Sequence, residues 1–294
     1  MPAADPFRSR RFACTACGAC CDRSPEVELC EAAALSDVFV FRLMFRLYEL
    51  PRSAGDWLAA RAGAGSAEVF YESKRLLAAF AARKYPVKQK TAGKTVEYTR
   101  YLTVSALTLD RGSGRCAALD RPLCGIYGRR PLSCRSVPFH YSRPKASAET
   151  YLDGFVARPG YACDTSAAAP LVLDGGRVVD HATRQVREEA LERAERDRPW
   201  REAIMRQMKV DARNRSLPSL RDIDAAAAFG ATTVSMRVAW QIAASAGLLT
   251  MEELRTLIAA QAETIERELA APDCAPATRE TLTEMRTEYA QLLS

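Results

Sequence analysis

Four cysteines lie within eight residues near the start of the chain, in the stretch ACTACGACCD (13–22). A hydrophobic core does not need thiols packed so densely. The spacing Cys-x2-Cys-x2-Cys places three sulfurs in one loop, which is typical of loops that wrap a metal ion or an iron–sulfur cluster. The fourth thiol directly follows the third, so we expect further ligands from elsewhere in the chain. The four residues are Cys14, Cys17, Cys20 and Cys21.

A second cysteine-bearing stretch, CAALDRPLCGIYGRRPLSC (116–134), supplies Cys116, Cys124 and Cys134, and Cys163 follows farther on. Together with the first four, these cysteines would make two sites of four thiolates each. The spacing does not tell which sulfur belongs to which site. The chain has only two histidines, so a site with several ligands must be built mostly from thiolates.

Three side chains near the second stretch are expected to support a thiolate site from outside the ligand set. A zinc ion or an oxidised four-iron, four-sulfur (4Fe-4S) cluster with four thiolates carries a net negative charge. Arg130 and Arg135 would stabilise that charge. Tyr127 either donates its hydroxyl to a ligand sulfur or only packs.

These two stretches resemble a known family. CTACGACC fits C-x2-C-x2-C-C, and CGIYGRRPLSCRSVP fits C-x2-Y-x2-R-P-x2-C-R-x2-P. In this order they are similar to the YkgJ-type cysteine-cluster family of zinc- or iron-chelating proteins, over about residues 13–165. The resemblance implies that the seven cysteines of the two stretches are ligands. Cys163 falls where the family has a late cysteine, but Asp164 and Thr165 stand where a proline and a glycine often follow.

Thiolates suit both zinc and iron–sulfur clusters, so ligand softness does not decide between them. The C-x2-C-x2-C run favours an iron–sulfur cluster, because structural zinc commonly uses two separated C-x2-C knuckles. Zinc remains the alternative cofactor. The main hypothesis is therefore a redox or catalytic iron–sulfur protein, and the second is a structural zinc module whose C-terminal helices bind a protein partner.

A third hypothesis comes from the resemblance alone: some members of the family resemble flagellin lysine methylases, which implies a protein-lysine methylase. No G-x-G-x-x-G follows a predicted strand, so no separate Rossmann unit is expected. The sequence identifies no substrate, and no catalytic residue is assigned.

The composition indicates in which cellular compartment these sites are expected. No apolar run is long enough to span a membrane and no secretory signal is visible, so we expect a cytoplasmic protein in which clustered cysteines bind metal rather than form disulfides. Positive charge is concentrated in residues 1–182, but no nucleic-acid-binding motif accompanies it. Cys30, Cys274, His140 and His181 are interpreted as ordinary structural residues.

We expect an α+β chain: a cysteine-cluster domain with a small antiparallel sheet and helices over residues 1–182, followed by a helical region over 183–294. Helices are predicted for 27–50, 55–85, 182–210, 222–247, 251–270 and 276–293, the fifth opened by a capping box at Thr250–Glu253. Strands, or a hairpin, are predicted within 94–110, a strand for 151–158, and a hairpin for 171–181 turning at Gly175–Gly176.

Overall fold

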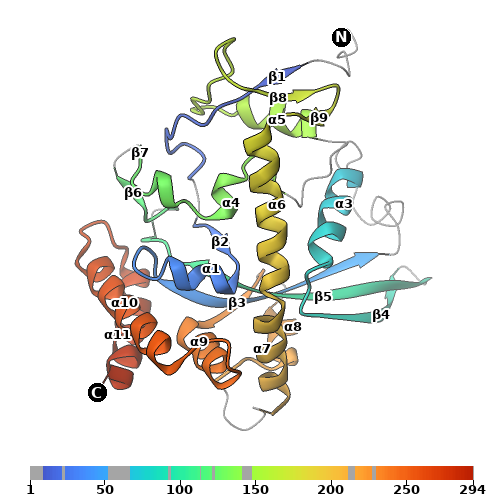
Figure 1. Cartoon of the computed structure of the whole chain (residues 1–294). Helices are drawn as coiled ribbons and strands as arrows, with labels where there is room; N and C mark the ends of the chain where they lie inside the picture. Colours follow the sequence, from blue (N-terminus) through green and yellow to red (C-terminus); the bar gives the residue numbers. More distant parts are fainter. Residues whose placement is uncertain are drawn as a thin grey trace.

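The computed structural model describes residues 9–21, 24–51, 67–91, 94–112, 114–120, 123–140, 148–210, 216–226 and 230–293. It is an α+β fold with antiparallel sheets and a helical C-terminal part (Figure 1). The strands are β1 Arg10–Arg11, β2 Glu26–Val27, β3 Phe41–Pro51, β4 Arg83–Thr91, β5 Lys94–Thr108, β6 Leu119–Asp120, β7 Leu123–Cys124, β8 Leu171–Asp174, β9 Arg177–Val178 and β10 Thr232–Ser235. The helices are α1 Leu29–Ala34, α3 Ala67–Ala78, α4 Leu132–Arg135, α5 Ala148–Val156, α6 His181–Arg196, α7 Arg198–Val210, α8 Leu220–Ala226, α9 Met236–Ser245, α10 Met251–Ala270 and α11 Pro276–Leu293, with a 3-10 turn at Tyr127–Arg129.

The largest sheet is built around β3, which pairs along its length with β5 and, on its other edge, with β10. The order is β10-β3-β5-β2, and β4 also pairs with β5. Figure 1 shows α7, α9, α10 and α11 gathered against one side of this sheet. The main hydrophobic core lies there and includes Phe45, Trp240 and Tyr289, each fully buried. The core therefore draws residues from both sides of position 182, and the domain boundary predicted there stays a prediction.

The prediction of one helix over 27–50 is wrong. Only Leu29–Ala34 is helical, and the apolar run that follows forms β3. Arg42 and Arg46 are four residues apart, which fits one face of a helix and equally one face of a strand. In the strand, Arg42 donates to the carbonyl of Thr233 and Arg46 pairs with Glu26.

Two further predictions of secondary structure need correction. The segment 151–158, predicted as a strand, belongs to α5, in which Ala148, Leu152 and Phe155 are buried at helical spacing. The helix predicted over 222–247 is interrupted by β10, and residues 83–85, predicted as helical, begin β4. The residues 55–66 of the predicted helix over 55–85 lie outside the described part of the chain.

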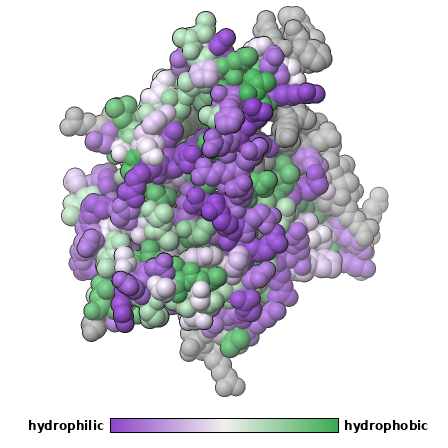
Figure 2. Space-filling model, viewed as in Figure 1, coloured by the Kyte–Doolittle hydropathy of each residue, from purple (hydrophilic) through white to green (hydrophobic). Residues whose placement is uncertain are grey.

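Other sequence predictions are confirmed. The β-structure predicted over 94–110 is present as the single strand β5, with no hairpin within it, and the hairpin at 171–181 is β8–β9, with Gly175 and Gly176 both at positive φ. The side chain of Thr250 accepts from the N–H of Glu253, and Glu253 accepts from the N–H of Thr250 in return. The surface over α6, which runs down the centre of the view, is mostly hydrophilic (Figure 2).

A buried carboxylate joins the N-terminal segment to the helices. Asp197 follows α6 and is fully buried, and its oxygens accept from the N–H groups of Leu29 (3.0 Å) and Cys30 (2.8 Å) at the start of α1. Arg201 lies 3.7 Å from Asp197 and 3.2 Å from Glu28. This carboxylate thus serves as the N-terminal cap that the neighbouring Glu28 side chain does not provide.

Candidate metal centre

The N-terminal cysteine loop is joined by main-chain hydrogen bonds to the second cysteine stretch. The N–H of Cys116 donates to the carbonyl of Cys21 at 3.1 Å, and that of Cys124 donates to the carbonyl of Ala16 at 3.3 Å. Ala16 and Gly18 both have positive φ, so the loop turns sharply between its cysteines. These bonds place residues about one hundred positions apart in direct contact.

The other side of the same loop is joined to the segment that carries Cys163. Ala13 and Asp164 form an isolated antiparallel bridge, with N–H to carbonyl distances of 2.8 and 3.0 Å. The hydroxyl of Thr15 donates to the carbonyl of Ala162 at 2.8 Å. Cys163 is thereby held beside the loop, although the residues after it differ from the family pattern.

Cys134 is brought to the loop by the short helix α4. The N–H of Leu132 at its start donates to the carboxylate of Glu31 at 2.9 Å, and the Leu132 side chain is buried against Ala190 and Ala194 of α6. Burial, followed by the neighbouring thiols of Cys116 and Cys20, raises the pKa of Cys134 to about 12. Because Leu132 packs against α6, that helix fixes the position of Cys134 within the fold.

The pKa values of several thiols are shifted by burial and by neighbouring thiols. Burial and the nearby Cys17, Cys14 and Cys20 raise the pKa of Cys163 to about 11. The pKa of Cys116 is raised by burial and by Cys124 and Cys20.

The pKa values of Cys21 and Cys17 are shifted as well, in opposite directions. A hydrogen bond with Cys20 and burial, together with Cys116 and Cys134, raise the pKa of Cys21. For Cys17, burial acts to raise the pKa but is outweighed by hydrogen bonds from Ala19, Ala162 and Thr15, which lower it. Thiols of the N-terminal loop thus influence the pKa of Cys163 and of thiols in the second cysteine stretch.

The three supporting side chains predicted from sequence differ in what they contact. Arg130 donates to the sulfur of Cys14 at 3.4 Å, and its guanidinium lies 3.7 Å from the centre of the Tyr127 ring. The hydroxyl of Tyr127 donates to the main-chain carbonyl of Cys14 at 3.2 Å, not to a sulfur. Arg135 pairs with Glu189 of α6. Arg130 is therefore the one of the three with a hydrogen bond to a predicted ligand sulfur among the described residues.

Sequence reasoning missed Thr15, Glu31 and Asp164, which hold the cysteine segments in place. Thr15 stands between two motif cysteines, and that position was the only signal it offered. The contact between Glu31 and α4 spans about one hundred residues and leaves no local signal. Cys274 is buried in the main core, and Cys30 lies in α1, where its N–H donates to Asp197.

In the described part of the chain, no three His, Cys, Asp or Glu side chains are placed so that they could hold a metal ion. Its helices include none that is both long and apolar enough to cross a membrane. In comparisons with known proteins, no family model, no curated protein and no solved structure matches this chain.

Proposed function

We propose that the protein binds an iron–sulfur cluster, or zinc as the alternative, through its clustered cysteine thiolates, in the manner of the YkgJ-type proteins that it resembles. The observation that carries this proposal is the joining of the N-terminal loop to two distant segments. Main-chain hydrogen bonds connect the loop to Cys116 and Cys124 on one side and to Asp164 on the other. The eight thiols would together supply the soft donor set that both cofactors prefer.

The neighbour relations support two ligand sets. Cys14, Cys17, Cys20 and Cys163 would form one set, because the first three influence the pKa of Cys163; Cys20 also influences Cys21, Cys116 and Cys134 and so lies next to the second set. The remaining four would form the other, because Cys116 influences both Cys21 and Cys134 and is itself influenced by Cys124. The second set is Cys21, Cys116, Cys124 and Cys134.

A bound iron–sulfur cluster would supply one-electron redox chemistry at this place. The chain's own groups would stabilise the negative charge of the thiolates. Arg130 already donates to Cys14, and Tyr127 holds Arg130 by a cation–π contact and by accepting from its Nε at the main-chain carbonyl. These contacts place a positive charge and an N–H donor beside the Cys14 sulfur, where they would offset the negative charge of a metal-bound thiolate.

Zinc would give the protein a different role. It would act as a structural cross-link, and the C-terminal helices would be the surface that recognises a protein partner. α11 ends with Leu292 and Leu293, two exposed leucines. Zinc binding predicts a colourless protein that loses its fold in the cysteine region on chelation.

Anaerobic purification with analysis of iron, sulfide and zinc separates these two cofactors. An iron–sulfur protein shows iron and sulfide together and a visible absorption that bleaches with dithionite. Cys116→Ser should lower the metal content, while Cys30→Ser, outside the two sets, should leave it unchanged. A protein without any bound metal after anaerobic purification and reconstitution would overturn the proposal for both cofactors.

The methylase hypothesis rests on the resemblance alone. Its test is incubation of the metal-loaded protein with S-adenosylmethionine and lysine-rich protein substrates, followed by mass spectrometry. A mass increase of one or more methyl groups on a substrate lysine supports the hypothesis, and unchanged substrates contradict it.

A further inference from the structure

A hollow of about 350 Å³ lies between the hairpin β4–β5 and helix α8, among residues that include none of the cysteines. This volume falls at the lower end of the range for small-molecule sites, roughly 300–1,000 Å³. Three of its lining residues are arginines, and only one is acidic. The lining residues are Arg83, Tyr85, Arg100, Leu220, Arg221 and Asp224.

The strand register places the polar residues of the hairpin on one face. Tyr85 of β4 is directly opposite Arg100 of β5, and Arg83 is two residues from Tyr85 on the same strand. Residues directly opposite in an antiparallel pair, and those two apart in a strand, project from the same face. All three side chains therefore project toward the face that α8 covers.

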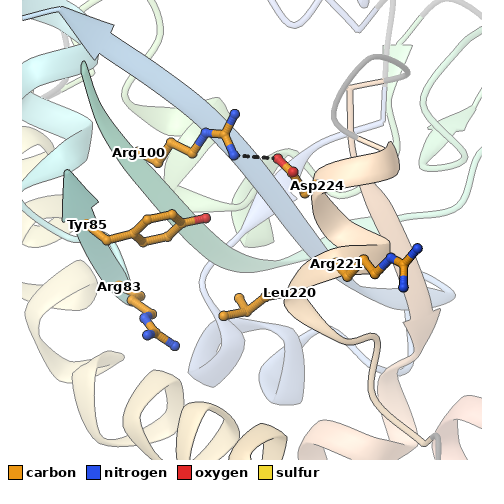
Figure 3. Close-up of a pocket in the computed structure, with 6 residues that line it drawn as sticks. All are labelled: Arg83, Tyr85, Arg100, Leu220, Arg221 and Asp224. Atoms are coloured by element: carbon orange, nitrogen blue, oxygen red, sulfur yellow. Dashed lines mark hydrogen bonds and ion pairs between the residues drawn. The ribbon is translucent and has the colours of Figure 1, made fainter. Parts of the chain in front are cut away.

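Arg100 is held in a fixed orientation. Its Nε donates to Glu49 of β3 and its Nη1 donates to Asp224 of α8, both at 2.7 Å. Figure 3 shows Arg100 and Asp224 on one side of the Tyr85 ring and Leu220 on the other. No hydrogen bond within the described residues uses the Nη2 of Arg100 or the hydroxyl of Tyr85, so both are available to a ligand.

Arg83 provides positive charge that the described residues do not neutralise. Its guanidinium lies 5.7 Å from the centre of the Tyr85 ring, and it has no carboxylate partner in the described part of the chain. Arg221 also lines the hollow, but Figure 3 shows its guanidinium directed away from the other five residues. The free charge of the hollow is thus carried mainly by Arg83.

We propose that this hollow binds a small organic anion, whose carboxylate or phosphate group is held by Arg83, Arg100 and the hydroxyl of Tyr85. Guanidinium groups suit oxyanions because their planar N–H donors match the oxygen geometry. The Tyr85 ring and Leu220 provide an apolar wall for the body of the ligand. The site goes beyond the proposed metal centre and does not depend on it.

Titration calorimetry with benzoate and with phenyl phosphate tests the proposal. At least one of them should bind saturably in the millimolar range or tighter, and the tighter of the two identifies the oxyanion. Benzamide, which has the shape of benzoate without its charge, should bind at least about tenfold more weakly, because a hydrogen bond to a charged group contributes about that much.

Variants locate the binding. Arg83→Gln should weaken binding of the better anion by about tenfold, and Tyr85→Phe, which loses only a hydroxyl, by about threefold. Arg206→Gln removes one positive charge from α7, outside the hollow, and should change the affinity by less than about twofold. Arg83 is exposed, so its substitution should leave the melting temperature unchanged.

Three results would overturn the proposal. One is the absence of saturable binding by both anions, and another is binding of benzamide as tight as that of benzoate. The third is an equal loss of affinity in the Arg83 and Arg206 variants, which would show that only the overall charge matters.

Discussion

The sheet built on β3 and the cysteine region are stabilised in different ways. Around the sheet, large side chains such as Phe45 and Trp240 are fully buried, and several main-chain groups next to β3 are paired with a side chain from a distant helix. Gln261 of α10 is one example, since it accepts from the N–H of Phe41 and donates to the carbonyls of Ser36 and Phe39. Burial of large apolar side chains is therefore the main source of stability around this sheet.

The cysteine region, which comprises the loop 13–21, the stretch 116–134 and the segment around Cys163, has much less apolar burial. Its strands β1, β6, β7 and β9 are two residues long, and the nearby hydrophobic cluster has five buried members. Its segments are joined by a few main-chain hydrogen bonds, and none of its eight cysteines is fully buried. A region with so small a core is the kind that commonly depends on a metal or a cross-link for stability. Metal loading should therefore stabilise the cysteine region more than the sheet built on β3.

The largest expected effect contrasts one core residue from each region. Phe45→Ala should lower the free energy of unfolding by about 4 kcal/mol, because it opens a cavity in the main core. Leu152→Ala, in the small cluster beside the cysteine region, should cost about 2 kcal/mol, since fewer neighbours surround it. Urea unfolding followed by circular dichroism measures both values. Equal losses would contradict the contrast.

A second pair compares a buried helix cap with a more accessible one. Asp197→Ala leaves two N–H groups of α1 without their acceptor and removes one of the two carboxylates beside the Arg201 guanidinium, and should cost about 3 kcal/mol. Asp180→Ala removes the cap of α6, where Asp180 accepts from Thr183, and should cost about 1 kcal/mol. A smaller loss for Asp197→Ala than for Asp180→Ala, measured by urea unfolding, would show that α1 is capped in another way.

A third pair tests the cysteine region itself and rests on the proposed metal centre. Arg130→Gln removes the hydrogen bond to the Cys14 sulfur and should weaken metal retention by about tenfold, close to 1.4 kcal/mol. Arg135→Gln removes an equal charge, but Arg135 pairs with Glu189, so retention should stay unchanged. Competition with a chelator measures both. The same loss in the two variants would assign the effect to net charge.

The smallest expected effect concerns pH and the buried cluster around Asp197. Burial, followed by the charge of Asp197, raises the pKa of Glu28 above its ordinary value of 4.5. Because the folded state holds this proton more tightly, the contribution of Glu28 to stability is present below pH 4.5 and is lost as the pH rises through the folded pKa. Glu28→Gln should remove this dependence and leave stability at pH 7 within about 1 kcal/mol of the original or higher.

Urea unfolding of the Glu28→Gln variant and the original protein across the pH range provides the measurement. The difference between the two stability curves should grow in favour of the variant as the pH rises above 4.5. Parallel curves, or a variant that is much less stable at neutral pH, would mean that the Glu28 carboxylate is charged in the folded protein and needed by Arg201.

The sequence predicts those elements whose signal is local. The dense Thr, Val and Tyr of β5, the Gly175–Gly176 turn and the Thr250 capping box are each confirmed. β3 was predicted wrongly although Phe41, Leu43, Phe45 and Leu47 are buried on one face and Arg42 and Arg46 lie on the other, because the four-residue spacing of the two arginines also fits a helix. An apolar run of that length does not distinguish a strand from a helix.

The candidate site also has residues that the sequence predicts and contacts that it does not. The cysteines and Arg130 could be chosen from motif spacing, because a ligand loop has a recognisable local pattern. The contacts that gather them could not, since Cys21 to Cys116, Ala13 to Asp164 and Glu31 to Leu132 are tertiary contacts between residues far apart in the chain. The spacing also could not tell that Arg135 turns to Glu189, because that partner lies on α6.

The position of β3 between β5 and β10 has a consequence for synthesis of the chain. β10 is made long after β3 and β5 have left the ribosome, yet it covers the edge of β3 from Arg42 to Phe45. Until then, that edge presents unpaired main-chain groups beside an apolar surface, the arrangement from which strands of different molecules associate. A nascent chain that stalls before Thr232 should therefore be prone to aggregate, and a chaperone that shields this edge would raise the yield of the complete protein.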